Sequence, residues 1–276
     1  MMPTVDLVGS GALPPRARFT TDAATLRLDG EWAVRWSPSW DAAPDDLGTP
    51  ELDLAGWEPI PVPSSWPMQG HGLPWYTNTR FPFPVDPPHV PDDNPIGDHA
   101  IRFDWEPGGA TLLRLEGVDA AGTVVVNGLT VGTTRGSRIV HEFDISAAVR
   151  PGSNLLVVRI ARWAETSYLE DQDMWWLPGL FRPVTVLDRP RDGIRDIRVE
   201  AGYRDGAASL RVEVDGAPAR VAVPELGIEA AAGELVSVPG AAPWSAEEPR
   251  LYDLVVTTPG ETARLRIGFR TVRIDG

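Results

Sequence analysis

The sequence contains no cysteine and no lysine, and all 25 of its basic residues are arginine. Without cysteine, disulfide frameworks, thiolate catalysis and cysteine-based zinc sites are excluded. Without lysine, no lysine nucleophile or Schiff base can form. The four histidines lack metal-ligand spacing, and neither a G-x-S-x-G motif nor a P-loop occurs. Several common kinds of active site are therefore excluded.

Long hydrophobic runs are also missing. No run of about 20 apolar residues occurs, and the start, MMPTVDLVGSGALPPRARF, has neither the basic region nor the apolar region of a signal peptide. The formal net charge of -14 would repel nucleic acid and anionic membranes over a Debye length of roughly 10 Å. We therefore expect a cytoplasmic protein that binds neither partner.

Turn residues are plentiful, with 27 glycines and 28 prolines dispersed along the chain. They separate strand-sized apolar stretches such as EWAVRW (31–36), HAIRFDW (99–105) and NLLVVRIARW (154–163). Asn127-Gly128 predicts a tight hairpin. No pattern of a long amphipathic helix occurs, so the predicted fold class is all-β.

Two domains fit in 276 residues with 42% hydrophobic content. Pro190 and Gly193 flank charged residues where a new strand begins, which predicts domains at residues 1–189 and 190–276. The second domain has five strand-like stretches with turn signals roughly 8 to 12 residues apart, the pattern of an immunoglobulin-like sandwich. It lacks the cysteine pair of antibody domains.

Eleven tryptophans are the most unusual positive feature. Indole faces stack on the apolar faces of sugars while neighbouring carboxylates and amides bind the hydroxyls, so Trp75, Trp175 and Trp176 are candidate stacking residues. Core packing is the alternative for each of them. In LPWYTNTRFPFP (73–84), prolines flank Asn78, whose amide could bind a sugar diol or cap its own turn.

The stretch TSYLEDQDMWW (166–176) places acidic and amide side chains directly before two tryptophans. It lacks the glycine and the final glutamate of a calcium loop, and a solvated charge run would be a poor neighbour for Met-Trp-Trp. In an extended backbone, Asp173 and Trp175 share one face, whereas Trp176 lies on the other. This stretch is the most pocket-like in the chain.

Residues 61–103 and 162–184, which contain these two stretches, resemble the N-terminal part of bacterial β-galactosidases of glycoside hydrolase family 2, as do LDGEWAVRW (28–36), VNGLTVGTTRGSRIVHEFDIS (126–146) and IGFRTVRI (267–274). The resemblance implies a jelly-roll sugar-binding sandwich, then an immunoglobulin-like sandwich, then a catalytic TIM barrel. The chain ends at Gly276, where that barrel would begin. We therefore expect the two catalytic glutamates and the magnesium ligands to lie outside this chain, which alone should be inactive.

The resemblance also assigns site residues. Asn78 and Asp173 match the family's sugar-hydroxyl contacts, and Asp173 also matches a carboxylate associated with bound sodium. The full-length enzyme would be a homo-oligomer that hydrolyses β-galactosides. Where the family has an arginine after EDQDMW, this chain has Trp176, which puts the local geometry in question.

Two alternatives to this function remain. One is a stand-alone carbohydrate-binding or interaction module, and the other is a family 2 hydrolase of different specificity, such as a β-glucuronidase or β-mannosidase. A cluster of arginines near Asn78 or Asp173 would favour a glucuronidase, and the sequence shows none beside them.

Overall fold

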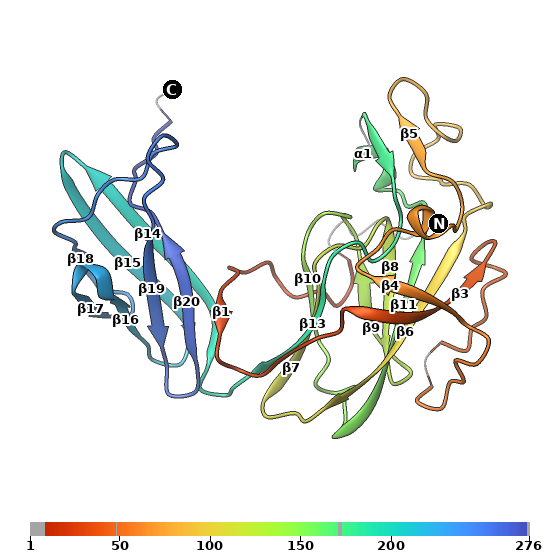
Figure 1. Ribbon diagram of the computed structural model, residues 1–276, viewed down its shortest axis with the longest axis horizontal. Helices are drawn as coiled ribbons and strands as arrows, with labels where there is room; N and C mark the ends of the chain where they lie inside the picture. Colours follow the sequence, from red (N-terminus) through yellow and green to blue (C-terminus); the bar gives the residue numbers. More distant parts are fainter. Residues whose placement is uncertain (1–8, 48, 171–172, 275–276) are drawn as a thin grey trace. The chain divides into compact units, whose positions relative to one another are not determined.

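A computed structural model describes residues 9–47, 49–170 and 173–274. The chain divides into two compact units, Met1–Pro15 with Thr25–Leu187 and Arg16–Ala24 with Asp188–Gly276. Each unit consists of antiparallel sheets (Figure 1), which confirms the predicted all-β class. The helical segments in the described ranges are α1 (Ser167–Glu170), η1 (Trp66–Gln69) and η2 (Pro224–Leu226). None of these described helices is long and apolar enough to cross a membrane.

The first unit is a sandwich of two large sheets. The six-stranded sheet, in the order β4-β3-β6-β11-β8-β9, consists of β3 (Gly30–Ser37), β4 (Glu58–Val62), β6 (Ile96–Trp105), β8 (Ala121–Val126), β9 (Leu129–Thr134) and β11 (Gly152–Ala161). The four-stranded sheet, in the order β10-β7-β13-β2, consists of β2 (Thr25–Arg27), β7 (Ala110–Leu115), β10 (His141–Asp144) and β13 (Val184–Arg189).

The core of the first unit lies between these sheets, and Trp32, Phe143 and Leu156 are among its fully buried residues. They come from strands in which alternate side chains point to opposite faces, so one face of each strand is apolar. Asn127 and Gly128 both have positive φ, at 48° and 84°, and join β8 to β9. The predicted hairpin is therefore confirmed.

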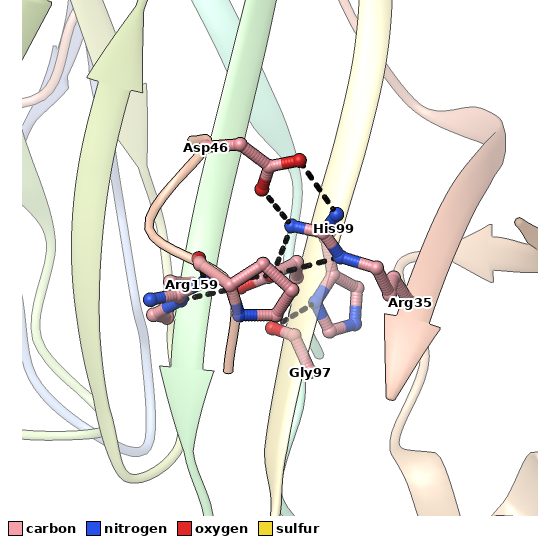
Figure 2. Close-up of polar contacts among 7 residues, drawn as sticks. Arg35, Asp46, Gly97, His99 and Arg159 are labelled. Atoms are coloured by element: carbon pink, nitrogen blue, oxygen red, sulfur yellow. Dashed lines mark hydrogen bonds and ion pairs between the residues drawn. The ribbon is translucent and has the colours of Figure 1, made fainter. Parts of the chain in front are cut away.

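The outer face of the six-stranded sheet is covered by the irregular segment between β3 and β4. Apolar residues of that segment pack against a patch of the sheet consisting of Ala100, Val125, Leu155 and Val157. Beside the patch, the buried Asp98 accepts hydrogen bonds from Arg159 at 2.6 Å and Arg35 at 3.1 Å. Arg35 also donates a hydrogen bond of 2.7 Å to Asp46 (Figure 2). A buried carboxylate needs such partners because it has lost its water.

The next residue, His99, points to the opposite face of the sheet, as period-two alternation requires. Burial lowers the pKa of His99 to about 4. Its Nδ1 lies 3.1 Å from the Gly97 carbonyl oxygen (Figure 2). The neutral ring accepts a hydrogen bond from Trp66 Nε1 at 3.0 Å. This contact holds the start of the segment that leads to β5.

The second unit is a smaller sandwich. One sheet, in the order β1-β20-β19-β16-β17, consists of β1 (Thr20–Thr21), β16 (Arg220–Val223), β17 (Ile228–Ala231), β19 (Tyr252–Thr257) and β20 (Thr262–Ile267). The other, in the order β14-β15-β18, consists of β14 (Ile194–Arg204), β15 (Ala207–Gly216) and β18 (Leu235–Ser237). They enclose a separate core that includes Leu254 and Phe269.

The predicted domain limits differ from this division at Arg16–Ala24. The sequence-based boundary places that segment in the first domain, whereas its strand β1 pairs with β20 of the second unit. Thr21 Oγ1 donates a hydrogen bond of 2.5 Å to Glu261, which also accepts one of 2.8 Å from the Ile194 amide. A long-range strand pairing of this kind leaves no local pattern in the sequence.

Candidate functional site

The two stretches that carry the predicted sugar contacts meet in a small sheet. β5 (Trp75–Thr77) pairs antiparallel with β12 (Met174–Trp176), with Trp75 opposite Trp176 and Thr77 opposite Met174. In Figure 1, β5 lies beside the green segment that contains α1. Residues almost a hundred positions apart are thus held at fixed separations by main-chain hydrogen bonds.

One face of this small sheet points inward. Trp176 is only 1% exposed, and its ring packs edge-on against Trp163 and Phe81 at centroid distances of 4.8 and 5.5 Å. Its Nε1 donates a hydrogen bond to Thr77 Oγ1. The interpretation of Trp176 as a sugar-stacking residue is therefore wrong, because its indole is enclosed in the core and its one polar atom is already paired.

The other face of the sheet points outward. Trp175 is 52% exposed, and its ring lies 5.3 Å from that of Tyr76, tilted by 55°. Trp75, the first residue of β5, lies on the same face as its partner Trp176 but is 44% exposed. These side chains have open aromatic surface, so the stacking of Trp75 and Trp175 on a sugar stays a prediction.

Tyr76 connects Asn78 with Asp173. Its hydroxyl donates a hydrogen bond to Asp173 Oδ1, and this bond raises the pKa of Tyr76 above its ordinary value, whereas a hydrogen bond with the Asn78 side chain acts in the opposite direction. Asp173 has φ of 50°, a left-handed conformation that aspartate tolerates better than most residues. Asp171 and Gln172, from the same stretch, lie outside the described residues.

An open cavity of about 480 Å³ borders this outward face. Its lining residues are Ser65, Tyr76, Asp119, Arg138, Asp173, Met174, Trp175, Leu177 and Phe181. Trp75 and Asn78 are not among them. The lining combines aromatic and apolar surface with carboxylates, a hydroxyl and a guanidinium, which suits a ligand that has both hydroxyls and an apolar face.

Asp119 and Arg138 are the charged lining residues that the sequence did not single out. Arg138 Nη2 lies 3.5 Å from Asp119 Oδ2, and its Nη1 lies 3.7 Å from the carboxylate of Glu170. Glu170 also accepts the backbone N–H of Ser137 at 3.0 Å. The loop between β9 and β10 is thus tied to the turn of helix that precedes Asp173.

Burial raises the pKa of Asp119 to about 6, because its side chain is 4% exposed and a buried carboxylate resists ionisation. The positive charge of Arg138 and a hydrogen bond with Ser137 oppose that shift, and the negative charge of Glu170 adds to it. Asp119 therefore titrates within two pH units of neutrality, unlike an ordinary aspartate.

No local signal pointed to this cluster. Asp119 follows a strand in LRLEGVDAAG, and Arg138 lies in the turn RGSR, where a charged residue is ordinary. The search for a cluster of basic residues near Asn78 or Asp173 in the sequence did not point to Arg138, because the tertiary fold brings Arg138 and Asp173 to one cavity.

The sodium ion implied at Asp173 needs several oxygen ligands. Asp173 supplies one carboxylate, and one of its oxygens already accepts the Tyr76 hydroxyl. Within the described ranges, no group of three or more histidines, aspartates or glutamates lies close enough together to hold a metal ion. The sodium site at Asp173 stays a prediction.

The first unit is thus a two-sheet β-sandwich with carboxylate, hydroxyl and indole groups around an open cavity. The model of one family, described as "Glycosyl hydrolases family 2, sugar binding domain", matches residues 26–190. The chain belongs to glycosyl hydrolase family 2.

Curated relatives agree with this family. A β-galactosidase of Arthrobacter sp. (strain B7) is 41% identical over an alignment of 299 positions, which covers 97% of this chain and 29% of the relative. A β-galactosidase of Vibrio vulnificus (strain CMCP6) is 33% identical over 94% of this chain and 29% of its own length. The chain thus spans less than a third of the curated relatives that it matches.

Solved structures show the same fold. A β-glucuronidase of an uncultured Clostridium sp. matches 95% of this chain and 47% of its own with a TM-score of 0.68 at 20% identity. The apo β-glucuronidase of Ruminococcus gnavus matches 97% of this chain and 48% of its own, with the same TM-score at 22% identity. At these identities the similarity concerns the fold alone.

Proposed function

We propose that this chain is the N-terminal, sugar-binding part of a family 2 hydrolase that cleaves terminal β-galactosides. The observation that carries the proposal is the β5–β12 sheet, which brings Asn78, Tyr76 and Asp173 together beside an open cavity. The β-galactosidase relatives at 33 to 41% identity support this substrate class.

Each residue has a distinct role in this proposal. The Asp173 carboxylate accepts a hydrogen bond from a sugar hydroxyl, which replaces the one from Tyr76. The Asn78 amide supplies both a hydrogen-bond donor and an acceptor. Trp175, which lines the cavity, covers an apolar C–H face of the ring. Trp75 is exposed outside that lining, so any stacking by Trp75 involves a part of the substrate outside the cavity.

Glycosidic cleavage itself requires two carboxyl groups about 5 Å apart on opposite sides of the scissile bond when configuration is retained. The cavity carboxylate of Asp119 and the nearby Glu170 both contact Arg138, so they do not face each other across a substrate. As the resemblance implies, we place the catalytic glutamates and the magnesium ligands in a TIM-barrel part of a longer protein, which would be a homo-oligomer. We expect this chain alone to be inactive.

Turnover of a chromogenic β-galactoside tests the proposal. The coding sequence that continues beyond Gly276 should be expressed both with this chain and without it, and the 276-residue chain should be assayed separately. Activity should require both parts. Asp173→Asn and Asn78→Ala should each lower kcat/KM roughly 10- to 100-fold, the loss expected for one hydrogen bond to a charged or closely matched group.

Asp215→Asn is the matched control. Asp215 pairs with Arg195 on the surface of the second unit, where both side chains are more than half exposed, so its loss should leave kcat/KM unchanged. Robust turnover by the 276-residue chain alone would contradict the proposal. Saturable galactose binding by that chain, with no enzyme domain in the same reading frame, would favour a stand-alone carbohydrate-binding module.

A further inference from the structure

A charge cluster borders the cavity beside Tyr76 and Asp173. The guanidinium of Arg138 lies between two carboxylates, 3.5 Å from Asp119 and 3.7 Å from Glu170. The carboxylates come from separate segments, one from the connection after β7 and the other from the end of α1. Asp119 is almost completely buried and Glu170 mostly so, whereas a third of the Arg138 side chain is exposed. Arg138 thus reaches the cavity while the two more deeply buried carboxylates pair with its guanidinium.

Arg138 supplies the one positive charge among the residues that line the cavity. Asp119 and Glu170 offset this charge, and Asp173 adds a further negative charge to the lining. Charges a few ångströms apart in a partly desolvated cavity interact several times more strongly than in bulk water. A sugar that carries a carboxylate would meet this repulsion and find no uncompensated cation. A neutral sugar would not.

We propose that Asp119 and Glu170 are specificity-determining residues. They offset the positive charge of Arg138 and so make the cavity select neutral sugars over uronides. This inference rests on the proposed function, because it places a sugar ring in the cavity. Without the two carboxylates, Arg138 would present a planar fork of N–H donors, which matches a carboxylate in a bidentate geometry.

A purely structural role for the cluster makes a different prediction. Glu170 binds the Ser137 amide, and Ser137 Oγ lies 3.4 Å from Asp119, so the carboxylates also hold the loop between β9 and β10. If they did nothing else, their removal would lower turnover of every substrate together. Charge compensation instead predicts that uronide turnover rises relative to galactoside turnover.

Two substrates that differ only at C6 separate these roles. The kcat/KM of the longer protein that carries this chain should be measured with p-nitrophenyl β-galactoside and p-nitrophenyl β-galacturonide. We expect the ratio of uronide to galactoside to rise at least about tenfold in Asp119→Asn/Glu170→Gln, because each variant side chain keeps its size but loses its charge. An unchanged ratio, with galactoside turnover retained, would overturn the inference.

Arg138 provides an internal check. Adding Arg138→Gln to the double variant should lower the ratio towards the wild-type level, since no guanidinium remains to bind the uronide. The matched control is Glu225→Gln, which removes an exposed partner of Arg250 in the second unit and should not change the ratio. If the double variant does not fold, Arg138→Gln alone is measured. A ratio below that of the wild type supports the inference, and an unchanged ratio opposes it.

Failure of the proposed function has a separate signature. A longer protein that cleaves no galactoside refutes that function whatever the variants do. The charge inference is then decided by the binding of free galacturonate to the 276-residue chain, followed by NMR titration. Tighter binding by Asp119→Asn/Glu170→Gln than by the wild type supports it, and equal binding by the two overturns it.

Discussion

Replacement of Asp119 by asparagine should make the stability of the first unit less dependent on pH. Burial raises the pKa of Asp119 from 3.8 to about 6 in the folded chain. Since one pKa unit corresponds to about 1.4 kcal/mol, ionised Asp119 lowers the free energy of unfolding by about 3 kcal/mol. Asparagine has nearly the same size and can still accept the hydrogen bond from Ser137, but it carries no charge.

The sign follows from proton uptake. At pH values well below 3.8, the side chain is protonated in both states and has no effect on stability. Between about 4 and 6, the unfolded chain has lost the proton while the folded chain keeps it, so the free energy of unfolding falls as the pH rises. Above the folded pKa, the loss is complete. About 2 kcal/mol of it falls between pH 4.5 and 7.5.

Urea unfolding followed by tryptophan fluorescence measures this effect. Every tryptophan except Trp244 lies in the first unit, so the signal reports mainly on the unit that contains Asp119. The difference in free energy of unfolding between Asp119→Asn and the wild type should increase by about 2 kcal/mol, in favour of the variant, from pH 4.5 to pH 7.5. Subtraction of the two curves removes the contributions of all other titrating groups. Parallel curves across this range would refute the reasoning, because they would mean that Asp119 has an ordinary pKa.

Three further predictions concern packing, a buried charge and the site. Trp176→Ala should lower the free energy of unfolding by about 3–5 kcal/mol in urea titrations, while Trp175→Ala should change it by less than about 1 kcal/mol, because only the first side chain is enclosed. Asp98→Asn should cost about 3–5 kcal/mol in the same assay, since it leaves two arginines without their buried carboxylate. Asp173→Asn should lower the raised pKa of Tyr76 towards its ordinary value, which phenolate absorbance in an alkaline titration would show; an unchanged titration would contradict the hydrogen bond.

Local patterns carried most of the fold prediction. Strands such as 31–36 and 99–105 could be recognised because alternation and turn residues are short-range signals, and the Asn127-Gly128 hairpin is encoded by two adjacent residues. The placement of Arg16–Ala24 in the second unit could not be recognised, because β1 pairs with a strand more than two hundred residues away.

The same division holds for the site. Trp175 and Trp176 are neighbours of one residue type, and strand alternation predicts only that they point to opposite faces. Which face is the inner one depends on Trp163 and Phe81, which come from other segments. The sequence therefore could not tell an exposed indole from a buried one, although the two have opposite consequences for ligand binding.

By itself, the sequence determined that this chain is all-β, acidic and free of cysteine and lysine chemistry, and that Asn78 and Asp173 lie in the range that matches family 2. Only the tertiary structure decided that Tyr76 stands between them and that Asp119 and Arg138 share the cavity of Asp173. The physical reason is the distance along the chain over which each interaction acts. Strand and turn propensities act between neighbouring residues, whereas burial, pKa and charge compensation depend on which distant segments the packed sheets bring together.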